Sequence, residues 1–252
     1  MQPIEIFLNR LSGKNEIFSE ISQKLNTEIT NSEKLMEYLS GSTANYVLYV
    51  SDENVQNSTI DEVMTAFADT NHTIIIDEFL NIIDDNDRIT TASKPRSLVH
   101  RDGELHPTVH VWLIRRRDMG IYVLLQKRSH NKDTYPDLWD VSSAGHVRQG
   151  QEYGITAINE TREELGLDLK REKLEFLGFR KNSHIEKNIK DNELTAIFMC
   201  RANIDDNMIK PSPEEVSKTE WAEIDELISV MDDNLKSCIS IEELAMIKKA
   251  VF

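Results

Sequence analysis

Residues 145–167 read GHVRQGQEYGITAINETREELGL. This stretch contains three carboxylates at helical positions i, i+3 and i+4, which lie on one helix face: Glu160, Glu163 and Glu164. Like charges at this spacing repel by only a few tenths of a kcal/mol on an exposed helix, so the cluster alone does not require a cation. However, Gly145 opens a loop before the helix and Gly166 follows as a C-cap. An oxygen ligand set in this frame favours a hard cation, Mg²⁺ or Mn²⁺.

The spacing resembles the Nudix box, in which a glycine is followed by five residues, a glutamate, seven residues and Arg-Glu-x-x-Glu-Glu-x-Gly with an apolar residue. The matching positions are Gly145, Glu160, Glu163, Glu164, Gly166 and Leu167. Two positions depart, because Gln151 replaces the first glutamate and Asn159 replaces the arginine. Two neutral amides leave no unpaired charge, so the paired change is compatible with an enzyme of altered activity and equally with a non-catalytic binder.

The resemblance extends beyond the box. The segments SKPRSLVHRDGELHPTVHVWLI (93–114), LLQKRSHNKDTYPDLWDVSSAGH (124–146) and DNELTAIF (191–198) look like the Nudix branch that neighbours isopentenyl-diphosphate isomerase. This resemblance implies the α/β class, specifically a Nudix-type αβα sandwich with a mixed sheet. For most members it also implies hydrolysis of a diphosphate linked to another moiety.

The resemblance implies functional roles for the residues of this chain that match the family's motif. It implies that the metal ligands come from Glu160, Glu163, Glu164 and the backbone of Gly145. Glu163 and Glu164 are the expected catalytic residues, since one glutamate can take a proton from a metal-bound water. Glu193 matches a position where many relatives place an extra acidic residue near the metals.

Basic residues beside the box are candidates for substrate binding. Arg128 and Lys127 end the segment LLQKR, and Arg128 is the preferred phosphate contact because its segment leads towards the box. His100, His106 and His110 are a possible metal trio, but their spacing of six and four residues does not form a compact helical site. Structural, hydrogen-bonding histidines are the alternative.

Composition limits the classes of function. The chain has 252 residues and a formal net charge of −15, which argues against binding nucleic acid through overall charge but permits a nucleotide substrate. No apolar run approaches the roughly 20 residues of a membrane helix, and the N-terminus does not resemble a signal peptide. Only Cys200 and Cys238 occur, without a disulfide framework, so a cytoplasmic location is expected.

Three segments are expected along the chain: an acidic α/β unit over 1–77, a Nudix domain over 78–235 and a C-terminal helix over 236–252. The first holds twelve acidic and four basic side chains. Its pattern predicts helices over 14–25, 31–39 and 58–67, the last with Ser58 as N-cap, and strands over 45–50 and 73–77. It has no ligand cluster, so a structural role, a protein partner or self-association is expected.

In the remainder, apolar runs predict strands over 109–114 and 121–128 and near 174–180 and 194–202, around a box helix over 154–165. Helical periodicity returns over 222–251. Strands on both sides of a central helix, with helices at the end, favour a mixed sandwich over a doubly wound parallel sheet.

Three functions remain. The first is an Mg²⁺- or Mn²⁺-dependent hydrolase acting on a small-molecule diphosphate, either a nucleoside diphosphate derivative or another organic pyrophosphate. The second is isopentenyl-diphosphate isomerase, whose resembling members carry a catalytic cysteine in a Cys-Gly-His segment. Here the segment is Ala144-Gly145-His146, and an alanine methyl cannot transfer a proton. The third is a non-catalytic module that binds a nucleotide or a protein.

Overall fold

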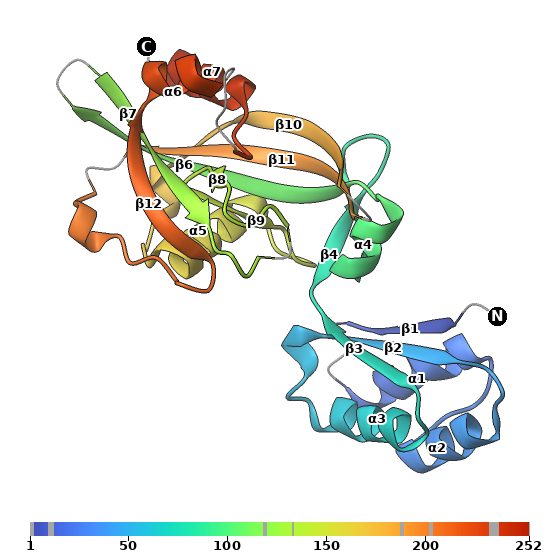
Figure 1. Ribbon diagram of the computed structural model, residues 1–252. Coiled ribbons are helices and arrows are strands. Elements are labelled where there is room, and N and C mark those ends of the chain that lie inside the picture. The colour runs from blue at the N-terminus through green and yellow to red at the C-terminus, as the bar shows by residue number, and fades with distance from the viewer. Residues whose placement is uncertain are drawn as a thin grey trace. The chain divides into compact units, whose positions relative to one another are not determined.

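The chain forms two compact units, shown in a computed structural model (Figure 1). The first unit comprises Met1–Leu80 and Thr91–Asp102, and the second comprises Asn81–Thr90 and Gly103–Phe252. The structure describes residues 3–9, 13–117, 120–132, 134–186, 189–201, 204–231 and 237–251.

The first unit is a small three-stranded parallel sheet with helices. Its elements are β1 (Ile4–Leu8), α1 (Lys14–Leu25), α2 (Ser32–Gly41), β2 (Tyr46–Ser51), a 3₁₀ turn (Asp52–Asn54), α3 (Ser58–Asp69), β3 (Thr73–Asp77) and α4 (Arg96–Asp102). The strand order is β1-β2-β3, and the apolar faces of α1, α2 and α3 share a core with β1 and β2. The cap of α3 is Asn57 rather than the predicted Ser58, because the Asn57 side chain accepts hydrogen bonds from the N–H groups of Thr59 and Ile60.

A second cluster of buried hydrophobic residues extends the first unit beyond β3. Leu98 of α4 and Phe79 are buried with Val47 and Tyr49 of β2. The first unit therefore includes residues beyond the predicted boundary at 77. The division falls within the two-stranded hairpin of β4 (Phe79–Ile83) and β5 (Ile89–Pro95).

The second unit is built around a seven-stranded mixed sheet. Its strands are β6 (His106–Arg117), β7 (Gly120–Arg128), β8 (Trp139–Asp140), β9 (Ser143–His146), β10 (Leu174–Glu186), β11 (Ile189–Arg201) and β12 (Val216–Glu223). The main order is β10-β11-β6-β7-β12, and β8 and β9 pair with β7 and β6. Strand β6 is parallel to β11 and antiparallel to β7 and β9, so the predicted mixed sheet is confirmed.

Helices cover both faces of this sheet. They are α5 (Tyr153–Leu165) on one face and α6 (Ile224–Met231) and α7 (Ile241–Val251) on the other, with 3₁₀ turns at Arg171–Lys173 and Asp206–Met208 (Figure 1). Alternate residues of a strand point to opposite faces. Val109 and Val111 are accordingly buried with Ala157 of α5, whereas Trp112 is buried with Leu244 of α7. The αβα sandwich is confirmed, and α7 contributes to its core.

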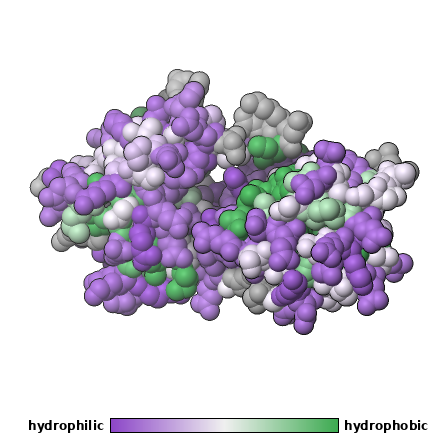
Figure 2. All heavy atoms as spheres, turned by 90° about the horizontal axis from the view of Figure 1, so that it is seen from below, coloured by the Kyte–Doolittle hydropathy of each residue, from purple (hydrophilic) through white to green (hydrophobic). Residues whose placement is uncertain are grey.

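The molecular surface is mainly polar. Hydrophilic residues cover most of the face seen in Figure 2, and hydrophobic residues show in smaller patches. Among the described residues, no helix is both long enough and apolar enough to cross a bilayer.

Candidate functional site

The box helix α5 begins and ends close to where the sequence predicts. Glu152 is the N-cap in extended backbone geometry, and Gly166 ends the helix with φ 66°. Its N–H donates to the carbonyl oxygens of Arg162 and Thr161, which confirms the predicted C-cap. A left-handed φ is costly for other residues, so glycine at 166 lets the chain leave the helix directly after the acidic cluster.

The three box glutamates differ in their surroundings. Glu163 is exposed, Glu160 is half-buried and Glu164 is only 2% exposed. Within the described part of the chain, the groups with ligand atoms all within 4.8 Å of one another do not include this trio. The helix therefore places the three carboxylates on one side, but their oxygen atoms do not all lie within 4.8 Å of one another.

Glu164 lies at the junction between the helix and the sheet. Its Oε2 accepts hydrogen bonds from the Ala144 N–H (3.0 Å) and from Gln126 Nε2 (3.2 Å). Burial raises the pKa of Glu164, and the hydrogen bond from the Ala144 N–H opposes this only in part. A cation beside the carboxylate would favour its charged form, so the environment of Glu164 fits a metal ligand.

Gly145 brings strand β9 against α5. A Cβ atom at this position would lie 2.1 Å from Cδ of Glu160 and within 2.5 Å of both its carboxylate oxygens. The missing side chain is therefore what allows the Glu160 carboxylate to lie on the backbone of β9. Gly145 is held in the sheet by pairing with Val109 of β6.

The two altered box positions have separate partners. Gln151 Oε1 accepts a hydrogen bond from Thr156 Oγ1 (3.1 Å), and Asn159 Oδ1 accepts one from Arg162 Nη1 (3.5 Å). The amides are thus accommodated locally, rather than as a pair that replaces an Arg–Glu ion pair.

The predicted phosphate contacts lie at the end of β7. Arg128 is engaged by the protein, since its Nε and Nη2 donate to the Thr134 carbonyl oxygen (3.1 and 2.9 Å) and Nη1 donates to Asp140 (3.1 Å). A phosphate at Arg128 would have to share or replace these bonds. Lys127 is half-buried and adjacent to Trp139 and Lys218 in the sheet register.

Glu193 belongs to a second group of potential metal ligands. Ligand atoms of His106, Asp191 and Glu193 all lie within 4.8 Å of one another. Glu193 is opposite His106 in the parallel pairing of β11 with β6. His106 Nδ1 is hydrogen-bonded to the Glu104 carbonyl (2.9 Å), and its Nε2 lies 3.7 Å from Asp191 Oδ1. One imidazole with two carboxylates suits Mn²⁺ or a later transition metal better than Mg²⁺.

The electrostatics of Glu193 agree with this grouping. Burial, followed by the charge of Asp191, raises the pKa of Glu193 to about 8. Sequence reasoning selected Glu193 but missed Asp191, although residues i and i+2 of a strand share one face. The pattern Asp-x-Glu was therefore the available signal.

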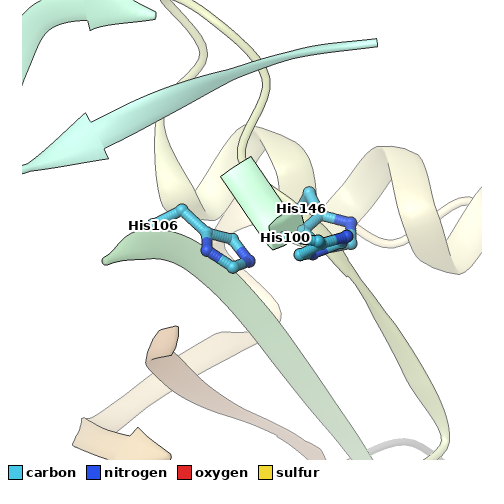
Figure 3. A group of neighbouring side chains, drawn as sticks. All are labelled: His100, His106 and His146. Carbon is cyan, nitrogen blue, oxygen red and sulfur yellow. The ribbon is translucent and has the colours of Figure 1, made fainter. Parts of the chain in front are cut away.

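The histidines do not form the trio considered from the sequence. His106 stacks on His146 of β9, with ring centroids 5.3 Å apart and an interplanar angle of 26°. Both rings are drawn in Figure 3. His110 is hydrogen-bonded to Glu243 of α7, and His100 lies on α4 of the first unit. Of these histidines, His106 and His146 lie together within the second unit.

Comparison with known proteins agrees with this architecture. A model of the NUDIX domain matches residues 104–239. An uncharacterized Nudix hydrolase of Clostridium acetobutylicum is 36% identical over 63% of this chain and 76% of its own length. Nudix hydrolase 3 of Arabidopsis thaliana is 30% identical over 68% of this chain, which spans only 21% of that protein.

Two further matches bear on the branch and on the fold. The isopentenyl-diphosphate Delta-isomerase of Clavibacter michiganensis subsp. michiganensis is 28% identical over 59% of this chain and 74% of its own. A Deinococcus radiodurans crystal structure superposes with a TM-score of 0.52 at 18% identity, covering 68% of this chain and 98% of the other. These matches confirm the resemblance and the predicted enzyme class, a Nudix-type pyrophosphohydrolase. The box helix, the mixed sandwich and the matching domain model together show that this chain belongs to the NUDIX domain family.

Proposed function

We propose that the chain hydrolyses a diphosphate linkage in a nucleoside diphosphate derivative or another organic pyrophosphate, using Mg²⁺ or Mn²⁺. The close approach of Gly145 to Glu160 carries this proposal. This approach places the Glu160 carboxylate directly on the backbone of β9. The N–H of Ala144, the preceding residue of β9, donates a hydrogen bond to Glu164 of α5. A carboxylate that lies on the backbone at this junction supports the proposal, because a cation bound there would stabilise its charge.

The roles follow from burial. Glu160 and Glu164 would hold the ion, together with the backbone carbonyl of Gly145. A divalent ion held there would neutralise phosphate charge and would lower the pKa of water. Glu163 is exposed, so it is free to accept a proton from water at the surface of the site. Lys127 and Arg128 offer positive charge to a phosphate from the end of β7.

A binding module without catalysis is the second candidate. The separate hydrogen bonds of Gln151 and Asn159 favour it, because the box has adapted to neutral amides at both positions. Isomerase activity is disfavoured, because Ala144 stands where a catalytic cysteine would be required.

Two wider proposals concern the whole chain. Cys200 and Cys238 are unpaired, which supports a cytoplasmic location. The acidic first unit carries no assigned ligand, and we assign it to a protein partner or to self-association.

A panel of nucleoside diphosphate derivatives and other organic pyrophosphates tests the function. Cleavage of a diphosphate that links two organic groups gives two phosphomonoesters, so the products are separated by chromatography and quantified with Mg²⁺, with Mn²⁺ and with excess chelator. We expect at least one compound to be hydrolysed only when a divalent ion is present. Binding without hydrolysis across the panel would favour the non-catalytic module, and conversion of isopentenyl diphosphate to its dimethylallyl isomer would support the isomerase.

A further inference from the structure

A single buried carboxylate joins α7 to two strands of the sheet. Glu243 has no exposed surface. It accepts hydrogen bonds from His110 Nδ1 (3.0 Å), Trp112 Nε1 (2.8 Å) and Arg180 Nε (2.8 Å). Helix α7, β6 and β10 therefore meet at one anion, and none of these residues belongs to the box.

This group carries an excess of positive charge. Burial lowers the pKa of His110, but the charge and hydrogen bond of Glu243 outweigh burial and raise this pKa to about 9. Burial would raise the pKa of Glu243, whereas His110 and Arg180 lower it to about 2. At neutral pH two cations therefore share one carboxylate, which leaves one positive charge unbalanced within the group.

The two cations keep donors that Glu243 does not use. Among the described residues, the Nη atoms of Arg180 and Nε2 of His110 have no hydrogen-bond partner in the protein. None of these atoms is fully buried. The side chains of Arg180 and His110 remain 14% and 12% exposed. Both side chains therefore keep some exposed surface, while Glu243 holds them through hydrogen bonds.

The sheet places these donors beside the second ligand group. Thr195 of β11 is opposite Arg180 of β10 on one side and Thr108 of β6 on the other. Glu193 lies two residues from Thr195, on the same face and about 7 Å along the strand. His110 is likewise two residues from Thr108. The cations and the carboxylate of Glu193 thus occupy one face of neighbouring strands.

Three further acids lie near the two cations: Asp140, Asp191 and Glu193. Asp140 forms an ion pair with Arg128 (3.1 Å), and Asp191 lies 3.7 Å from His106 Nε2. Asp140 and Asp191 therefore each have their own basic neighbour. Glu193 lies on the same face and interacts electrostatically with both His110 and Arg180. The inference therefore rests on the unused donors of the two cations and not on surplus charge.

We propose that Arg180 and His110, held by Glu243, bind a phosphate group of a diphosphate ligand on the α7 face of the sheet. Arg180 offers its planar pair of Nη donors, and His110 adds Nε2–H. This inference goes beyond the proposed function, because the site lies on the α7 face and α5 covers the other face. It rests on the proposed function for the identity of the anion. Glu243 acts as a positioning residue, because it touches the two cations and not the ligand.

Binding of methylenediphosphonate, a diphosphate analogue that cannot be hydrolysed at its bridge, tests the proposal. Calorimetry is done with the full chain at pH 7 and with chelator, so that no metal can carry the anion. We expect Arg180→Gln to raise the Kd at least about tenfold, the effect of losing a charge-assisted hydrogen bond. Lys181→Gln is the matched control, since it removes one positive charge from the next, exposed position of β10 and should change the Kd less than twofold.

A second readout is the imidazole ¹⁵N resonance of His110, which should shift when the analogue is added. If Arg180→Gln does not fold, Arg180→Lys and this resonance carry the test, and the lysine variant should bind more weakly because it lacks the fork. Absence of binding by the wild type, equal Kd values for both variants, or an unmoved His110 resonance would overturn the proposal. Hydrolysis of the substrate panel alongside any of these results would leave the proposed function standing.

Discussion

Gly145→Ala is the substitution whose effect can be worked out most directly from the structure. An alanine Cβ would lie 2.1 Å from Cδ of Glu160, whereas carbon atoms in contact are about 3.5 Å apart. The carboxylate must therefore move by roughly 1.4 Å. It is the end of a half-buried, rotatable side chain, so we expect unfolding free energy to fall by only about 1 kcal/mol. A displacement of this size should lower kcat/KM by about 100-fold.

The assay combines urea unfolding with steady-state hydrolysis of whichever panel compound is cleaved. Gly41→Ala is the control, because a Cβ there meets nothing within 4 Å and activity should be unchanged. In a Glu160→Ala background the clash disappears, so Gly145→Ala should no longer destabilise the protein. An equal destabilisation in both backgrounds, or full activity of Gly145→Ala, would refute the reasoning.

Three other outcomes are expected. Glu164→Gln should weaken divalent-ion binding in calorimetry while the circular dichroism spectrum is unchanged, and an unchanged affinity would count against a ligand role. Gln151→Glu and Asn159→Arg should act additively on kcat/KM within about 0.5 kcal/mol, because the amides have separate partners; a larger coupling would restore the idea of a pair. The pKa of His110 is raised to about 9, so its pairing with Glu243 stabilises the fold fully below pH 6.5 and is lost as the pH rises towards 9. Glu243→Gln should remove that fall, on the order of 3 kcal/mol, from the pH dependence of urea unfolding, and an unchanged pH profile would contradict the pairing.

Local patterns in the sequence were sufficient for the box helix and most of the strands. The acidic cluster and Gly166 predicted α5 almost to the residue, because capping and helical spacing depend on neighbours in the chain. The strand predicted over 73–77 matches β3, whereas the predictions over 109–114 and near 174–180 are shorter than β6 and β10, and β12 was not predicted. Strand β10 runs to Glu186 rather than 180, since its polar end pairs with β11 and pairing does not require apolar residues.

Local sequence patterns could not predict the contacts within the group of His106, Asp191 and Glu193, or those that Glu243 makes. His106 meets Glu193 only through the parallel register of β6 with β11. Glu243 meets His110 across 133 positions of sequence. A lone glutamate in an amphipathic C-terminal helix looks like an ordinary solvated residue, so its burial could be learned only from the packed structure.

The central claim is that the box carboxylates hold the ion that supports hydrolysis. Its most direct test is the rate of hydrolysis as a function of Mg²⁺ concentration for the wild type, Glu164→Gln and Glu172→Gln. Glu172 is exposed and outside the box, so its variant should stay within twofold of the wild type. We predict that Glu164→Gln requires more Mg²⁺ and loses at least about 100-fold in kcat/KM. An Mg²⁺ dependence and a rate equal to those of the wild type would contradict the account.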